Sequence, residues 1–386
     1  MNALQEYEKQ FLFILKSAIN NESIPDGYQF DISRVFKLAS IHNVLPIIFN
    51  AVSRCGADVS RYKSAAVWLC GQQISKNENF RRIYEKICSS GITPLIVKGP
   101  VCAECYNDSS LRLSSDFDLV IKEAELHQLH NLFTAEGFEF KNNAYTSSEK
   151  GLYIEVSSGF GEGSDFYADK TDEFLMPCFE NYEFSDIFAT LPCNEHLYYL
   201  FYHAFKHFIG SGFGVKQICD IYLYIKKYNN KLDFDKVCLM LKDAGIKNFA
   251  DNIMEFISVI FGFDCELTDT IYNKYIHLDD FAADILDAGV FGKSTEDRLH
   301  SATVVQNAVH GDGRKSVVKS LFPPLEYMKG RFQILRKLPF LLPLMWLVRI
   351  FMYIFSSAER NRSVSPANSI KIASERIDLM KKMGII

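Results

Sequence analysis

Two aspartates, Asp116 and Asp118, stand two positions apart in an apolar, strand-like run that continues to Val120. Side chains at positions i and i+2 of a strand point to the same face, so both carboxylates are expected on one face. Two carboxylates on a buried strand cost free energy unless something neutralises their charge. A divalent cation does this, and hard cations prefer oxygen ligands. The pair therefore predicts a metal site, and the residues do not choose between Mg²⁺ and Mn²⁺.

Glu155 is the predicted third carboxylate of this site. It lies in a second strand-like run, Tyr153-Ile154-Glu155-Val156. A site that holds two metal ions about 4 Å apart needs a carboxylate beyond the bridging pair. We expect Glu155 on a neighbouring strand that faces the same side, where it would also take the proton of an attacking hydroxyl. The competing interpretation is an exposed strand carboxylate outside any site.

A turn at Lys98 and Gly99 follows the apolar run Leu95-Ile96-Val97 and is the predicted phosphate-binding turn. Gly99 lets the backbone approach a phosphate closely, and a helix beginning at Pro100 would point N–H groups at it. Lys98 either faces the leaving pyrophosphate or belongs to a structural ion pair. Arg112 and Ser115 flank the aspartate pair and are predicted to bind phosphate oxygens, although Arg112 also fits a solvated loop. Together these residues predict metal-dependent transfer of a nucleoside monophosphate from a triphosphate to a hydroxyl.

His203 and His207 are four positions apart and share one face of a predicted helix. The spacing is that of zinc-binding histidine pairs, but no Glu follows His203, which disfavours zinc-protease chemistry. Two interpretations stay open. The histidines are partly buried on an aromatic helix, or they line the cleft with Lys216 and Asp220 and hold nucleotide or acceptor.

Short helices and strands alternate around these residues. The pattern predicts the order helix, strand, helix, strand, helix, strand, strand, which is typical of a small mixed sheet. The predicted segments are a helix over 79–91, a strand over 94–97, a helix to about Tyr106, a strand over 117–121, a helix over 123–137, and strands over 138–140 and 152–156. Asn194 is a plausible N-cap for a later helix, which the glycine-rich stretch 210–214 ends.

These elements predict an α+β protein with four segments. Residues 1–88 form an N-terminal helical region, and residues 89–190 form the mixed-sheet core. Residues 191–312 form a helical domain that covers the cleft, and residues 313–386 form a basic and apolar helical tail.

Composition narrows the class of partner and the compartment. The chain has 386 residues, is 48% hydrophobic and carries a net charge of −5. A generally basic surface is absent, so no specific nucleic acid is expected as a partner. The charged N-terminus is not a secretory signal, and ten scattered cysteines are typical of reduced thiols, so we expect a cytoplasmic protein. Cys102 and Cys105 lack the second pair that a zinc site needs.

The tail has a different composition from the rest of the chain. Between Arg314 and Arg349 there are eight basic residues, and the only acid is Glu326. The apolar run 338–348 contains two prolines and is too short to span a bilayer. It fits either a helix in the plane of a membrane, with peripheral contact through 314–356, or a core helix with Lys and Arg at its edges. Core packing is favoured, because a basic rim alone is weak evidence for a membrane.

These motifs resemble those of a known family, the uncharacterised nucleotidyltransferases of the DNA-polymerase-beta-like superfamily, also called the nucleotidyltransferase family 5 group. The resemblance rests on runs spread over most of the chain, namely 39–46, 95–99, 112–120, 153–156, 203–207, 220–222 and 289–292. The tail resembles that of members found near bacterial surface-polysaccharide genes. The resemblance implies a polymerase-beta-like core in which Asp116, Asp118 and Glu155 hold the metal. This chain departs from the superfamily pattern at Gly99-Pro100, where Gly-Gly or Gly-Ser is usual.

The resemblance implies a nucleotidyltransferase that uses a nucleoside triphosphate such as ATP and an unknown hydroxyl acceptor, expected in surface-polysaccharide biosynthesis. The acceptor would be a small molecule, a sugar or a protein side chain. The alternative is a catalytically weak nucleotide-binding sensor or scaffold on the same fold, which the altered phosphate turn motivates. A third hypothesis is an enzyme that adenylylates a partner protein.

Overall fold

The computed structural model describes residues 4–141, 143–161, 166–210, 212–263, 278–289, 334–346 and 366–386, and single residues at 298, 301, 305, 309, 325, 328, 332 and 348. The chain divides into two compact units. The larger unit comprises Leu4–Phe205 and Val215–Lys274, and the smaller unit comprises Met1–Ala3, Lys206–Gly214 and Tyr275–Ile386. The four-segment organisation expected from composition stays a prediction.

A five-stranded mixed sheet lies at the centre of the larger unit. Its strands run in the order β1 (Leu95–Ile96), β2 (Phe117–Val120), β5 (Leu152–Ser157), β4 (Ala144–Ser147) and β3 (Glu139–Lys141). Strands β2 and β5 pair in parallel, and every other neighbouring pair is antiparallel. The predicted α+β class with a small mixed sheet is thereby confirmed. Strand β4 was not predicted, and it completes a hairpin with β3.

One face of β2 belongs to the core and the other carries the carboxylates. Phe117 and Leu119 are each 1% exposed, and they alternate with Asp116 and Asp118. The ring of Phe117 stacks on Phe80 with centroids 4.1 Å apart. Because side chains alternate along a strand, burying Phe117 and Leu119 on one face places Asp118 on the other.

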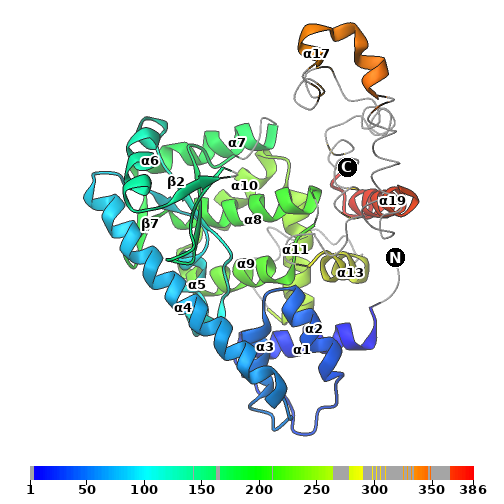
Figure 1. Cartoon of the computed structure of the whole chain (residues 1–386). Coiled ribbons are helices and arrows are strands. Elements are labelled where there is room, and N and C mark those ends of the chain that lie inside the picture. The colour runs from blue at the N-terminus through cyan, green and yellow to red at the C-terminus, as the bar shows by residue number, and fades with distance from the viewer. Residues whose placement is uncertain are drawn as a thin grey trace. The chain divides into compact units, whose positions relative to one another are not determined.

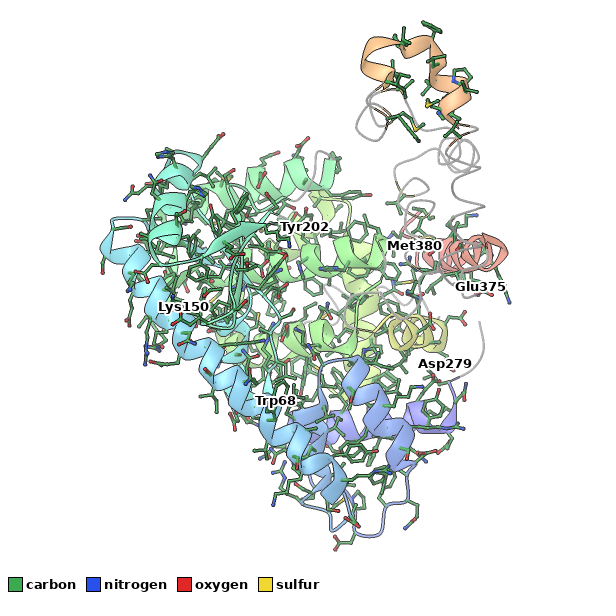
Figure 2. The ribbon with its side chains drawn as sticks, viewed as in Figure 1. Trp68, Lys150, Tyr202, Asp279, Glu375 and Met380 are labelled. Atoms are coloured by element: carbon green, nitrogen blue, oxygen red, sulfur yellow. The ribbon has the colours of Figure 1, made fainter. Side chains whose placement is uncertain are left out.

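Helix α4 (Ser60–Ser89) brings Phe80 to this core. It is much longer than the predicted helix at 79–91, because no proline interrupts residues 60–89. Figure 1 shows α4 as the long light-blue helix, with α3 near its first half and α6 near its end. Figure 2 labels Trp68, an exposed side chain on α4.

Helices surround the sheet in the larger unit. The N-terminal helices are α1 (Glu6–Asn20), α2 (Ile32–Ile41) and α3 (Leu45–Val52). Within and after the sheet region lie α5 (Pro100–Ala103), α6 (Leu126–Ala135) and α7 (Phe166–Leu175). The later helices are α8 (Cys193–Ile209), most of which belongs to this unit, α9 (Val215–Tyr228), α10 (Phe234–Asp243) and α11 (Lys247–Phe261). Short 3₁₀ turns lie at Ser109–Leu111, Glu123–Glu125, Met176–Glu180 and Asn229–Lys231.

The region before α8 differs from the prediction in two details. A hairpin of β6 (Glu183–Ser185) and β7 (Phe188–Thr190) precedes it, and this hairpin was not predicted. Asn194 is not the N-cap, because α8 already begins at Cys193, and the Asn194 side-chain oxygen accepts a hydrogen bond from the Asp233 N–H at 2.8 Å. The predicted break holds, since α8 ends at Ile209 and α9 begins at Val215.

The smaller unit contains α13 (Leu278–Ala288), α17 (Ile334–Lys337), a 3₁₀ turn at Pro339–Leu341, and α19 (Pro366–Lys382). Figure 2 labels Asp279 on α13, and Glu375 and Met380 on α19. Arg298 is 2% exposed, and its guanidinium forms an ion pair with Asp284 of α13 at 2.8 Å. Arg376 on α19 donates to the Gly210 carbonyl at 2.7 Å.

The core-packing prediction for the apolar tail is wrong. Phe340 is 72% exposed and Leu344 is 51% exposed, although both lie in the run predicted to pack inside. The physical reason is local, because the backbone breaks at Pro339: α17 ends at Lys337 and a 3₁₀ turn spans Pro339–Leu341, so the run does not form one helix with one buried face. Among the helices formed by described residues, none combines the length and apolarity needed to cross a bilayer.

Candidate functional site

Lys98 lies between a carboxylate on β2 and a histidine on α8. Its Nζ atom is 3.0 Å from Oδ1 of Asp118 and 2.9 Å from Nε2 of His203. The side chains of Lys98 and Asp118 are only 16% and 17% exposed. A charged lysine only donates, so the His203 nitrogen accepts. The structure thus brings together three residues that the sequence placed on three separate elements.

The parallel pairing of β2 and β5 places Glu155 beside Asp118. The two residues are register partners, as are Leu119 and Val156. Register partners on adjacent strands point to the same face, so Asp118 and Glu155 share the face opposite the Phe117 core. Glu155 is exposed, whereas Asp118 is mostly buried.

The charges of these groups shift the pKa values of their neighbours. Burial alone would lower the pKa of Lys98, but the carboxylates of Asp118 and Asp116 outweigh it and hold this pKa above its usual value. Burial, and then the charges of Glu155 and Asp116, raise the pKa of the Tyr153 hydroxyl. Asp116 is thus close enough to influence Lys98 on one side and Tyr153 on the other. The negative charge of all three carboxylates is concentrated on one face of the sheet.

A pocket of about 190 Å³ opens beside Asp118 and Glu155. It extends along the two parallel strands toward their carboxyl ends, and α8 contributes Tyr199 to its wall. The described residues that line it are Asp118, Val120, Asn143, Glu155, Val156, Ser157, Gly159, Phe160 and Tyr199. Tyr199 also stacks on His203, with ring centroids 6.1 Å apart, so it joins the pocket to the Lys98 cluster. Figure 2 labels Tyr202, the next tyrosine along α8.

The loop after β5 forms one wall of this pocket and is fixed by Asp172 of α7. Oδ1 of Asp172 accepts from the N–H groups of Phe160 and Gly161 at 2.6 and 2.9 Å. A Cβ atom at Gly161 would lie 2.3 Å from the Ala168 carbonyl oxygen, so only glycine fits there. The wall is therefore held in place before any ligand arrives.

The Lys98-Gly99 turn depends on a glycine conformation and on a buried histidine. Gly99 has φ 61° and ψ −116°, a positive φ that L side chains rarely adopt. Before the turn, Nε2 of His196 donates to the Val97 carbonyl at 2.9 Å. Burial lowers the pKa of His196 to about 4, so its ring is neutral at pH 7. The helix predicted to run to about Tyr106 ends earlier in the structure, since α5 spans only Pro100–Ala103.

Arg112 is buried in an ion pair, away from the pocket lining. Its Nε and Nη2 atoms donate to the two carboxylate oxygens of Asp220 at 2.8 and 2.7 Å, and Nη1 donates to Ser114. Tyr106 donates to the same carboxylate at 2.8 Å. Lys216 donates to the Leu113 carbonyl at 3.1 Å. This network secures the segment that leads into Asp116, so these side chains position the aspartates.

Burial is the largest influence on Lys216. It lowers the pKa of this amine to about 8, and the nearby positive charge of Arg112 acts in the same direction. Asp220 and Asp116 act in the opposite direction without restoring the ordinary value. Lys216 in this network thus loses its proton more readily than an ordinary lysine.

The remaining predicted site residues lie at the edge of the cluster or beyond it. Ser115 is exposed, and its hydroxyl donates to Oδ1 of Asp116 at 3.1 Å, so it orients that carboxylate. His207 lies in the last turn of α8, where its carbonyl accepts from the Gly212 N–H at 2.8 Å, and it does not line the pocket. The site roles assigned from the sequence stay predictions.

Sequence reasoning missed Tyr199, Phe160, Asn143 and the anchor Asp172. One signal was available for the wall, because glycines alternate with other residues at Gly159, Gly161 and Gly163 directly after a strand. Such a run is typical of a tight turn or of a close approach by backbone or ligand. Nothing comparable marks Tyr199, which is one of several tyrosines on α8.

The carboxylates suit a hard divalent cation by their chemistry. Asp116, Asp118 and Glu155 offer oxygen ligands on one face, and Lys98 Nζ already supplies a positive charge to Asp118. In the part of the chain that the structure describes, no three His, Cys, Asp or Glu side chains converge closely enough to share one ion. Glu155 is exposed, and exposed side chains change rotamer within nanoseconds.

The comparisons with known proteins concern the region that contains this site. A family described as "Uncharacterised nucleotidyltransferase" matches residues 28–262, which include the sheet, the Lys98 turn and α8. Neither the comparison with curated proteins nor that with solved structures finds a match.

Proposed function

Because this chain belongs to the uncharacterised nucleotidyltransferase family, we propose that it transfers a nucleoside monophosphate from a nucleoside triphosphate to a hydroxyl acceptor. The observation that carries the proposal is the register of β2 and β5, which puts Asp118 and Glu155 side by side above the Lys98 turn. Acidic oxygen ligands next to a lysine are what transfer of a charged phosphoryl group requires. The resemblance of the tail adds the expectation of a role in surface-polysaccharide biosynthesis.

In the proposed reaction an acceptor hydroxyl oxygen forms a bond to the α-phosphorus. The bond between the α-phosphorus and the oxygen that bridges to the β-phosphorus breaks, and pyrophosphate leaves with that electron pair. Glu155 is exposed beside the pocket, so it is placed to take the hydroxyl proton. Lys98 offers a positive charge to the developing negative charge on the pyrophosphate.

Asp116, Asp118 and Glu155 would hold Mg²⁺ or Mn²⁺. When bound, such an ion neutralises phosphate charge and favours an ionised acceptor oxygen. Asp118, which now lies 3.0 Å from Lys98, would be one of the ligands, and His203 would still contact the lysine at 2.9 Å from its other side.

A nucleotide-binding sensor or scaffold is the second candidate, and one observation favours it. Helix α5 has only four residues and begins with Pro100, which has no N–H to offer a phosphate. Under this alternative the protein binds a triphosphate without turnover. Binding and turnover therefore have to be measured separately.

The proposal is tested with single substitutions of the carboxylates. Asp116→Asn, Asp118→Asn and Glu155→Gln keep the side-chain size and remove the charge. We expect each to lower pyrophosphate release at least 100-fold and to weaken Mn²⁺ binding measured by electron paramagnetic resonance, on the scale of losses seen when catalytic electrostatics are removed. Asp26→Asn is the control, since Asp26 is exposed on a loop far along the chain from the site.

Full turnover by Asp118→Asn would contradict the proposed mechanism. Nucleotide binding by the wild-type protein with no pyrophosphate release, across all four nucleoside triphosphates and a broad set of acceptors, would favour the sensor.

A further inference from the structure

The pocket beside Asp118 and Glu155 and the phosphate turn lie on opposite sides of these carboxylates. Strand β1 runs antiparallel to β2, with Ile96 opposite Leu119, so Lys98 and Gly99 come next to the amino end of β2. A Cβ atom at Gly99 would lie 3.6 Å from the Phe117 ring, which agrees with this placement. The pocket instead extends toward the carboxyl ends of β2 and β5, to Val120 and Ser157. A triphosphate at the turn and a second molecule in the pocket would therefore meet at the carboxylates.

The chemistry of the lining disfavours an anion. Of the nine residues that line the pocket in the described chain, none is Lys, Arg or His, and two are carboxylates. Lys98 Nζ lies 3.0 Å from Asp118 and is already paired with that carboxylate, so a phosphate group in the pocket would face mostly like charge. The uncharged polar residues of the described wall are Asn143, Ser157 and Tyr199. The Ser157 hydroxyl donates to the Gly159 carbonyl at 2.8 Å and can still accept a hydrogen bond, whereas the Asn143 amide offers both donors and an acceptor.

The floor of the pocket is aromatic and rigid. Phe160 and Tyr199 are 1% and 4% exposed, and their rings meet edge to face with centroids 6.3 Å apart. Asp172 fixes the Phe160 backbone. An aromatic floor with a few polar groups around it suits a ligand with an apolar C–H face and hydroxyls at its rim.

The size of the pocket limits the occupant. Its volume of about 190 Å³ is below the roughly 300–1,000 Å³ of pockets that take drug-sized ligands. It has room for one small ring of a ligand.

We propose that this pocket is the acceptor site and that it takes an uncharged, hydroxyl-rich ring of about one monosaccharide. This inference rests on the proposed nucleotidyl transfer, which it deepens by naming the acceptor class. The hydroxyl that reacts would point at Glu155, while Asn143 and Ser157 bind other hydroxyls of the ring.

Asn143 offers a substitution that leaves the fold intact. Its φ is 62°, so glycine fits its backbone and removes only the amide. Asn43, with φ 59°, allows the same change outside the pocket lining and serves as the matched control. Loss of one ligand hydrogen bond predicts a roughly 5- to 10-fold weaker binding for Asn143→Gly.

The experiment measures ligand binding and turnover on the same proteins. Saturation-transfer NMR is run on the full chain with glucose, N-acetylglucosamine and myo-inositol, then with glucose 6-phosphate and adenosine. We expect at least one neutral ring to bind, with Asn143→Gly weakening it and Asn43→Gly leaving it unchanged. The same neutral ring should accelerate pyrophosphate release from the triphosphate.

Two results would overturn the acceptor assignment. One is that none of the neutral rings binds, and the other is that glucose 6-phosphate or adenosine binds in their place and is the ligand that Asn143→Gly weakens. Failure of the proposed function looks different, since a neutral ring would then bind with the expected Asn143 dependence while no triphosphate is turned over.

Discussion

The buried pair of Arg112 and Asp220 allows a decisive prediction about whether Arg112 holds the structure or binds phosphate. Their side chains are 4% and 7% exposed, and two hydrogen bonds at 2.7 and 2.8 Å join them. Burial opposes the charge on Arg112, but Asp220 outweighs it and holds the arginine pKa above its usual value. Asp220→Asn removes the carboxylate charge and leaves a buried guanidinium without a counter-charge. Breaking such a pair costs about 3–5 kcal/mol.

The assay is thermal unfolding followed by circular dichroism. With about 2–4 °C per kcal/mol for a unit of this size, Asp220→Asn should lower the Tm by about 6–20 °C. Glu78→Gln is the matched control, because the Glu78–Arg82 pair at 3.0 Å is exposed on α4. An exposed pair is worth under about 1 kcal/mol, so the control should melt within about 4 °C of the wild type.

One result would refute this reasoning. If Arg112→Met and Asp220→Asn both melted like the wild type, and Arg112→Met alone lost nucleotide binding, Arg112 would be a phosphate ligand. The sequence-based assignment of Arg112 would then be correct and the structural role derived from its burial would be wrong.

Three further outcomes are expected from other parts of the chain. His196 has a pKa lowered from 6.5 to about 4, so the folded state binds fewer protons than the unfolded state between these values. Unfolding free energy should therefore fall by about 3 kcal/mol as the pH falls from 6.5 to 4, and His196→Asn should flatten this slope in urea titrations; an unchanged slope would contradict the neutral ring. Gly161→Ala should destabilise by about 1–3 kcal/mol because its Cβ meets backbone, whereas Gly71→Ala, with nothing within 4 Å, should stabilise α4 by about 1 kcal/mol in the same thermal melts; equal effects would refute the packing argument. Phe340→Ser with Leu344→Ser should reduce co-sedimentation with anionic lipid vesicles, since both side chains are exposed in a basic segment; unchanged co-sedimentation would remove these residues from membrane contact.

The part of the site that sequence could predict is the part encoded in short runs. Asp116 and Asp118 are two apart beside buried Phe117, and this local alternation alone places them on one face. Glu155 could be assigned to a neighbouring strand because its own run alternates in the same way. The structure agrees with that strand assignment, since Glu155 is the register partner of Asp118.

The unpredicted features depend on contacts between distant residues. The partner of Arg112 lies 108 positions later in the chain, and no local pattern distinguishes a buried arginine from a solvated one. His203 meets Lys98 across 105 positions, so the sequence could only leave its role open. Strand β4 has four residues without strong apolar alternation, and it exists because β3 and β5 pair with its two edges.

Proline content explains the error in the tail. The run 338–348 is as apolar as a core helix, and composition alone favoured burial. Pro339 instead begins a 3₁₀ turn directly after α17, and Phe340 in that turn is exposed. Hydrophobic content sets the tendency to be buried, while the backbone decides whether a continuous buried face can form.

The most direct test of the central claim follows both ends of the triphosphate in a single reaction. The wild-type protein and Asp118→Asn are incubated with Mg²⁺, an acceptor panel, and nucleoside triphosphate labelled at either the α- or the γ-phosphate. Nucleotidyl transfer predicts that α-label joins the acceptor, that γ-label leaves as pyrophosphate in equal amount, and that Asp118→Asn does neither. Transfer of γ-label to the acceptor, or release of single phosphate instead of pyrophosphate, would contradict the account.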